Sequence, residues 1–234
     1  MMGPLANIRA VCFDLDNTLW DVWPVIQRAE QAMYDFLALK YPRVTAAMTV
    51  EMLREARQET ARAYPQMAHD FTFLRTQTLR DHAREFGYAE AMVEEAFEAF
   101  LQARNEVVLY DDVLPGLERL KDRFRLFTAS NGNADLKRIG LAHYFERSLN
   151  ARQVGALKPD PILFHKVIEG TDLQPQQVVY VGDDPALDVV GARAAGMCPV
   201  WINREQALWP SELGAQPYTV QSLHELGAAL GVQT

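Results

Sequence analysis

Two spacings of apolar residues divide this chain. From Ala10 to Phe13 the residues are apolar without a break, which predicts a strand buried on both faces. The strand runs directly into Asp14-Leu15-Asp16-Asn17-Thr18, a polar tip with two carboxylates two positions apart. By itself this tip is compatible with an Asp-rich turn or with a cation site, since paired carboxylates repel each other unless a cation lies between them.

A helical spacing follows the tip. From Trp20 to about Asp112, apolar residues recur every three or four positions, which is typical of helices with one buried face. Thr49 is expected to cap one of the helices and Gly87 to end another. We expect four helices in this insertion, over residues 24–41, 49–63, 70–86 and 89–108.

After Pro115-Gly116 the pattern alternates between strands and helices. Strands are expected over 124–129, 145–149, 178–181, 199–202 and 218–220, and helices over 117–123, 134–140, 161–169, 186–196 and 223–230. Alternating βα units predict a parallel sheet with helices on both faces, and the opening strand must join that sheet. The fold class is therefore α/β, with a core domain over 1–19 and 113–234 and a helical domain inserted over 20–112.

Composition limits the possible partners. The 234 residues carry a net charge of −8, which argues against a nucleic-acid or anionic-membrane partner. No stretch approaches the ~18 apolar residues of a membrane span. Cys12 and Cys198 lie in apolar, strand-like stretches and are expected to be buried reduced thiols. With no long apolar segment before Ala10, we expect a cytoplasmic protein.

Polar residues follow several predicted strands at their carboxyl ends, where an open parallel α/β sheet binds its ligand. Each of these residues also has an ordinary structural explanation: a helix entry, a solvated lysine, or carboxylates at a helix N-terminus. Their occurrence in this order, after successive strands, favours one shared site. The residues are Asp14, Asp16, Ser130-Asn131-Gly132, Lys158 and Gly182-Asp183-Asp184, with Asp188 one helical turn later.

The charges of this site need balancing. Lys158 supplies one positive charge against several carboxylates, so a divalent cation is expected, and hard oxygen ligands suit Mg²⁺. A metal among carboxylates, a serine and a lysine indicates phosphoryl transfer.

These motifs resemble those of the haloacid dehalogenase-like (HAD) superfamily. Asp14-Leu15-Asp16-Asn17-Thr18 is similar to its DxDxT motif, and Ser130, Lys158 and the acidic run from Asp183 are similar to its other three motifs. The resemblance implies a Rossmann-like HAD core, and it makes the insertion over 20–112 a helical C1 cap.

The resemblance also implies roles for residues. Asp14 is then the nucleophile that forms an aspartyl-phosphate, and Asp16 is the acid and base. Mg²⁺ is held by Asp14, by the backbone carbonyl of Asp16 and by Asp183. Ser130, Lys158 and the backbone near Asn131 bind the substrate phosphate, and Lys158 also stabilises the charge on Asp14.

The implied activity is hydrolysis of a small phosphorylated metabolite by a monomer or homodimer. The chain resembles bacterial phosphatases of flavin mononucleotide and of phosphoribitylaminouracil, and Arg75, His69 and Trp20 are candidates for substrate selection. Three alternatives stay open: a phosphotransferase or mutase, a 2-haloacid dehalogenase, and a non-catalytic binding protein. Asp16 favours phosphate esters, because the hydrolytic dehalogenases need no acid for the leaving group.

Overall fold

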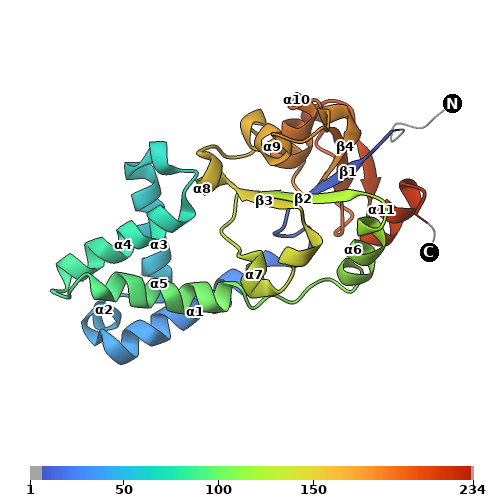
Figure 1. The fold of residues 1–234 in the computed structure, drawn as a ribbon. Helices are drawn as coiled ribbons and strands as arrows, with labels where there is room; N and C mark the ends of the chain where they lie inside the picture. The colour runs from blue at the N-terminus through green and yellow to red at the C-terminus, as the bar shows by residue number, and fades with distance from the viewer. Residues whose placement is uncertain (1–6, 233–234) are drawn as a thin grey trace. The chain divides into compact units, whose positions relative to one another are not determined.

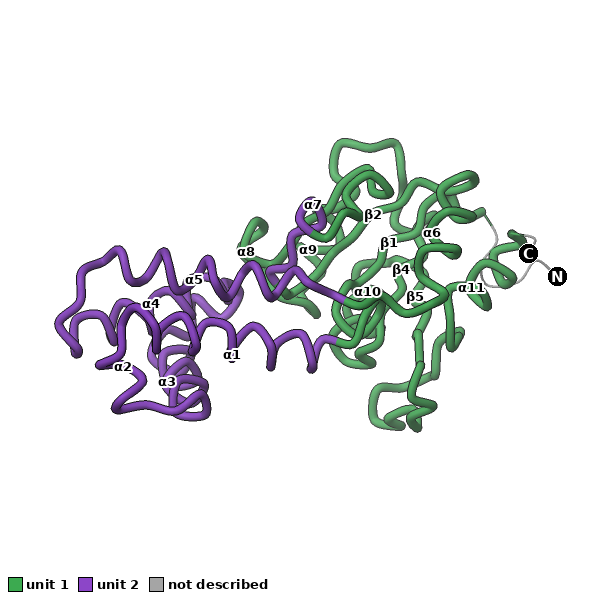
Figure 2. The backbone as a smooth tube through the Cα atoms, turned by 90° about the horizontal axis from the view of Figure 1, so that it is seen from below, with its two compact units in different colours: residues 1–21, 108–132, 139–234 green, residues 22–107, 133–138 purple. Residues whose placement is uncertain are grey.

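The computed structural model describes residues 7–232, and they form two compact units. One unit, the core, contains the described residues up to Asp21, then Val108–Gly132, then those from Ile139 onward (Figure 2). The other unit, the cap, contains Val22–Val107 and Asn133–Arg138.

A six-stranded parallel sheet organises the core (Figure 1). Strand β1 (Ala10–Phe13) lies between β2 (Arg125–Ser130) and β4 (Val178–Gly182), and it is completely buried. The strand order is β3-β2-β1-β4-β5-β6, with β3 at Arg147–Asn150, β5 at Cys198–Ile202 and β6 at Tyr218–Val220. The predicted α/β sheet is thus confirmed, and the opening strand is a central one.

Helices cover both faces of this sheet (Figure 1). On one face, α9 (Pro161–Ile168) and α10 (Gly191–Ala194) share a buried apolar cluster with alternate residues of β1 and β4. On the other lie α6 (Val113–Lys121) and α11 (Leu223–Ala229), which approach closely where Gly116 meets Leu223. The shorter helical segments of the described chain are α7 (Leu136–Ile139), α8 (Ala151–Val154), 3₁₀ turns at Pro65–Met67, Ala142–Tyr144, Pro175–Gln177 and Ser211–Leu213, and a π-helix at Pro185–Val190; of these, Pro65–Met67 and most of α7 belong to the cap.

The cap is helical, with its own apolar core. Its helices are α1 (Val22–Lys40), α2 (Pro42–Ala47), α3 (Val50–Ala63), α4 (Phe71–Glu85) and α5 (Ala91–Arg104). The predicted cap at Thr49 is confirmed, since its side chain accepts from the Met52 N–H, and Gly87 has φ +68° just beyond α4. Helix α2 was not expected: Pro42 ends α1 and also begins the next helix, because proline fits a first helical turn.

The return from the cap differs from the expectation in two places. Helix α6 begins at Val113, so Pro115 lies inside its first turn instead of preceding it. Residues 133–138, expected within the core, group with the cap, because the Asp135 N–H donates to Asn105 Oδ1 at 2.7 Å and Arg138 pairs with Glu98 at 2.7 Å.

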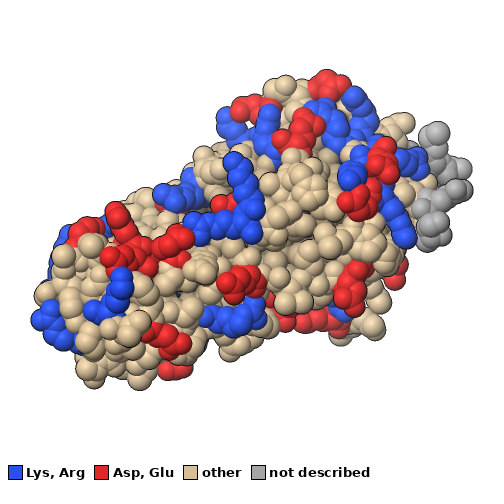
Figure 3. Space-filling view, turned by 60° about the horizontal axis from the view of Figure 1, so that its bottom comes forward, with Lys and Arg blue, Asp and Glu red and all other residues tan. Residues whose placement is uncertain are grey.

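Of the two cysteines, one lies where it was expected. On the face drawn in Figure 3, basic and acidic side chains are interspersed. Cys12 is buried as expected, whereas Cys198 is half-buried, and both thiols are free. Within residues 7–232, no helix combines the length and apolarity that crossing a bilayer requires.

Candidate active site

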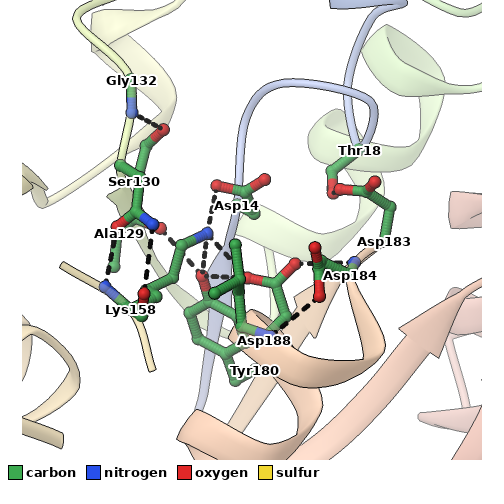
Figure 4. Close-up of polar contacts among 12 residues, drawn as sticks. Asp14, Thr18, Ala129, Ser130, Gly132, Lys158, Tyr180, Asp183, Asp184 and Asp188 are labelled. Carbon is green, nitrogen blue, oxygen red and sulfur yellow. Dashed lines mark hydrogen bonds and ion pairs between the residues drawn. The ribbon is translucent and has the colours of Figure 1, made fainter. Parts of the chain in front are cut away.

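Three neighbouring strands bring the predicted side chains together (Figure 4). Asp14 follows β1, Ser130 ends β2, and Asp183 follows β4. These strands are adjacent and parallel, so their carboxyl ends meet at one edge of the sheet. Residues more than 100 positions apart in the sequence, such as Asp14 and Lys158, therefore share one buried site.

Lys158 lies at the centre of this site. Its Nζ is 2.6 Å from Asp14 Oδ1, 2.7 Å from Asp188 Oδ1 and 3.2 Å from the Tyr180 hydroxyl. An ammonium has three N–H donors, so these three oxygens match its full capacity. Burial disfavours the charged lysine, but the two carboxylates outweigh that effect and the pKa of Lys158 stands above its ordinary value. The lysine is therefore a fixed positive charge beside Asp14.

Tyr180 and Asp188 hold the Lys158 ammonium in place through hydrogen bonds. The Tyr180 hydroxyl donates to the Ala129 carbonyl at 2.8 Å and lies 3.2 Å from Asp188 Oδ1. Asp188 also accepts the Asp184 N–H at 2.9 Å through Oδ2. Sequence reasoning gave Tyr180 no role, because a tyrosine in an apolar strand is usually a core residue. Only the fold places its hydroxyl beside Lys158.

The carboxylates form a candidate metal centre. Oxygens of Asp14, Asp183 and Asp188 all lie within 4.8 Å of one another. Burial, reinforced by the charge of Asp188, raises the pKa of Asp183 to about 7. Burial also raises the pKa of Asp14, and the charge of Lys158 opposes that rise. Three carboxylates face one ammonium, so the site has an excess of negative charge that fits a divalent cation with hard oxygen ligands. Because both oxygens of Asp188 accept hydrogen bonds, Asp14 and Asp183 are the better candidates to hold it.

Neighbouring groups hold Asp183 in place, whereas the Asp184 side chain bonds to the backbone of the next helix. The Trp201 indole donates to the Asp183 carbonyl at 2.8 Å, and the Thr18 hydroxyl lies 3.5 Å from Asp183 Oδ1. Asp184 Oδ1 accepts the N–H groups of Ala186 and Leu187, both at 2.8 Å. The Asp184 side chain therefore caps the π-helix that follows it.

The side chains of Ser130 and Asn131 make different hydrogen bonds. Ser130 Oγ accepts the Gly132 N–H at 3.1 Å, which leaves its own hydroxyl proton available for donation. The Asn131 amide contacts the main chain of Lys158 twice, accepting from its N–H at 2.8 Å and donating to its carbonyl at 3.3 Å. The Asn131 side chain thus holds the loop that carries Lys158.

The three candidates for substrate selection lie in different surroundings. Trp20 belongs to the core, is fully buried and donates its indole N–H to Asp16 Oδ1 at 2.8 Å, so it does not offer an open surface to a substrate. Arg75 lies inside the cap, 3.5 Å from Glu30 and with its guanidinium 3.7 Å from the Phe100 ring centre.

Burial, and then the charge of Arg57, lowers the pKa of Arg75 to about 9. His69 is half-buried in the turn before α4.

The chain matches known proteins over most of its length. A family model described as haloacid dehalogenase-like hydrolase covers residues 8–196. The 5-amino-6-(5-phospho-D-ribitylamino)uracil phosphatase YigB of Escherichia coli (strain K12) is 31% identical over 218 residues, which are 90% of this chain and 91% of that protein.

Solved structures agree with this match. The structure described as a 2-haloacid dehalogenase from Pseudomonas syringae pv. Tomato DC3000 is 36% identical, with a TM-score of 0.90 over 96% of this chain and 98% of that one. A HAD phosphatase from Thermococcus onnurineus is 28% identical, with a TM-score of 0.69 over 97% and 99% of the two chains. The motifs, the sheet and these matches agree, and the chain belongs to the haloacid dehalogenase-like hydrolase family.

Proposed function

We propose that this protein is a Mg²⁺-dependent phosphomonoester hydrolase that works through an aspartyl-phosphate on Asp14. The observation that carries the proposal is the buried ion pair of Lys158 and Asp14, whose charged atoms are 2.6 Å apart. Asp183, at the end of the strand next to that of Asp14, lies beside this pair. A carboxylate beside a fixed ammonium and further carboxylates suits attack on an anionic phosphorus centre.

In this proposal the reaction has two steps. An Asp14 oxygen attacks phosphorus, and the ester P–O bond breaks while Asp16 donates its proton to the leaving alcohol oxygen. Water then attacks the phosphorus of the aspartyl-phosphate while Asp16 takes a proton from that water, the bond between the Asp14 oxygen and phosphorus breaks, and inorganic phosphate leaves with the Asp14 carboxylate restored. The Ser130 hydroxyl and the Asn131 backbone N–H bind the phosphate oxygens, and the positive charge of Lys158 beside Asp14 stabilises the phosphoryl group.

The Mg²⁺ ion would be held by the side chains of Asp14 and Asp183 and by the Asp16 backbone carbonyl. When bound, it reduces the repulsion between the anionic nucleophile and the phosphate. The excess of carboxylates over ammonium groups supports this assignment.

For the substrate we propose a small phosphorylated metabolite, with flavin and ribityl phosphates as the first candidates. The similarity to the Escherichia coli ribitylaminouracil phosphatase supports that choice. His69, which is half-buried, is the first proposed selecting residue of the cap. Arg75 is the second, and it would have to leave Glu30 and the Phe100 ring to meet a substrate anion. We further propose a cytoplasmic monomer or homodimer without a nucleic-acid or membrane partner, consistent with the net charge of −8.

A 2-haloacid dehalogenase is the second candidate, because the Pseudomonas syringae structure carries that description. Asp16 distinguishes the two activities, since a halide leaving group needs no proton. The test is an assay of p-nitrophenyl phosphate and a metabolite panel with Mg²⁺, beside chloride release from 2-chloropropionate.

We expect phosphate release that Asp14→Asn abolishes, while Asp122→Asn on the exposed end of α6 leaves it unchanged. Chloride release without phosphate release would refute the proposal.

A further inference from the structure

The indole of Trp20 lies against the side chain that the proposed mechanism uses as its acid. Trp20 Nε1 donates to Asp16 Oδ1 at 2.8 Å. Trp20 is completely buried, whereas Asp16 is half-buried. A buried indole N–H restrains a carboxyl more firmly than a solvated donor would, because water does not compete for the bond.

The local chain fixes Trp20 from two sides. The N–H of Leu19 donates to the Leu15 carbonyl at 2.8 Å, and the N–H of Asn17 donates to the Trp20 carbonyl at 2.7 Å, with Asn17 at φ +58°. This tight turn brings Trp20 back beside Asp16. Trp20 also pairs with Leu109 in an antiparallel bridge, so the segment that returns to the core holds it as well.

We propose that Trp20 is a positioning residue for Asp16, and this inference rests on the acid–base role proposed for Asp16. The indole holds Oδ1 and thereby restricts the rotation of the Asp16 carboxyl. In the first step the proton of Asp16 moves to the leaving oxygen as the P–O bond breaks. In the second step the same carboxylate receives a proton from the attacking water. A fixed carboxyl serves both transfers without a search among side-chain rotamers.

A purely structural role makes a different prediction. A buried indole needs an acceptor in any case, and Asp16 could serve only as that acceptor. Loss of the N–H would then lower the rate equally for every substrate, through stability or local order. If Trp20 positions the acid, the loss of rate is small for esters whose leaving group departs without a proton and large for esters whose leaving group must be protonated.

The experiment compares Trp20→Phe with wild type on phosphate monoesters whose leaving groups range from p-nitrophenol to simple alcohols. We measure kcat/KM, which reports the step in which the leaving group departs. The expected result is a change within about threefold for p-nitrophenyl phosphate and a loss of about 10- to 100-fold for alkyl phosphates. An equal loss for all esters, or no loss for any of them, would overturn the proposal.

Trp209→Phe is the matched control. Its indole N–H donates to a backbone carbonyl, that of Gly214 at 2.8 Å, whereas that of Trp20 donates to a carboxylate. This variant should leave the leaving-group dependence unchanged. In an Asp16→Asn background, Trp20→Phe should add no further dependence on the leaving group, whereas an additional dependence would count against the proposal.

Two outcomes keep this test separate from that of the proposed function. If wild type hydrolyses no phosphate ester, the proposed function itself fails. If Trp20→Phe does not fold, 3-benzothienylalanine at position 20 removes only the N–H donor and keeps the shape of the ring system, and the same series of esters then decides.

Discussion

Lys158 and Asp14 form an ion pair of 2.6 Å, and their side chains are 3% and 8% exposed. The lysine follows β3 and the aspartate follows β1, so the pair joins two strands that flank β2. Because Lys158 also pairs with Asp188, one ammonium is the shared counter-charge of two buried carboxylates. Removing it leaves both without a counter-charge.

Lys158→Met should therefore damage both stability and activity. We expect a loss of about 3 kcal/mol in the free energy of unfolding, because breaking a buried pair leaves an uncompensated charge. The value of kcat should fall by about 100- to 1,000-fold. Urea unfolding and steady-state kinetics provide the measurements. Lys166→Met removes an exposed pair with Glu169. This control should change the free energy of unfolding by no more than about 0.5 kcal/mol and should leave kcat unchanged. A Lys158→Met enzyme with near wild-type kcat would refute this role of the lysine.

Gly182→Ala should displace Asp188. A Cβ at this position would lie 2.2 Å from Asp188 Cγ, so the carboxylate would have to leave Lys158 and the Asp184 N–H. We expect a destabilisation of about 1–3 kcal/mol together with a large loss of kcat. The control is Gly227→Ala in α11, where the nearest atom is Val232 Cβ at 3.8 Å. That change should stabilise by about 0.5–1 kcal/mol. Equal effects of the two substitutions would contradict the packing argument.

Asp183→Asn should remove the stabilisation by Mg²⁺. Wild-type stability should rise with the ion concentration, by about 2.7 kcal/mol at 100 times the dissociation constant, and EDTA should reverse the rise. Asp183→Asn should show little of this effect, as followed by thermal unfolding. The control Glu169→Gln, which changes an exposed carboxylate, should respond like wild type. An unchanged response of Asp183→Asn would exclude Asp183 as a ligand.

The same aspartate predicts a pH dependence in the absence of metal. Burial and Asp188 raise its pKa from 3.8 to about 7, so the folded state favours the protonated carboxyl. Its stabilising contribution is complete below about pH 4 and is lost as the pH rises through 7. Metal-free wild type should therefore lose stability relative to Asp183→Asn between pH 5 and pH 8. Parallel pH curves of the two proteins in urea unfolding would contradict this expectation.

Part of the fold could be predicted from local spacing. The uninterrupted apolar runs of β1 and β4 and the helical spacing of the cap are properties of neighbouring residues, and strand and helix periods differ. Thr49 could be recognised at a helix start, because an N-cap depends on residues only three positions away. Helix α2 was missed because Pro42 was read only as the end of the preceding helix, although proline also fits a first helical turn. The grouping of residues 133–138 with the cap depends on contacts between distant residues, so the sequence did not predict it.

The sequence by itself determined which groups could act: two carboxylates after β1, a serine after β2, a lysine in the loop after β3 and α8, and an acidic run after β4. Their order predicted one site, because parallel strands end at a common edge. The tertiary structure decided which of these groups contact one another and which side chains hold them in place. Asn131 holds the lysine loop, Tyr180 supports Lys158, and the segment at Leu109 pairs with Trp20. A hydrogen bond depends on a few ångströms and an angle between residues far apart in sequence, and only the packed sheet sets those.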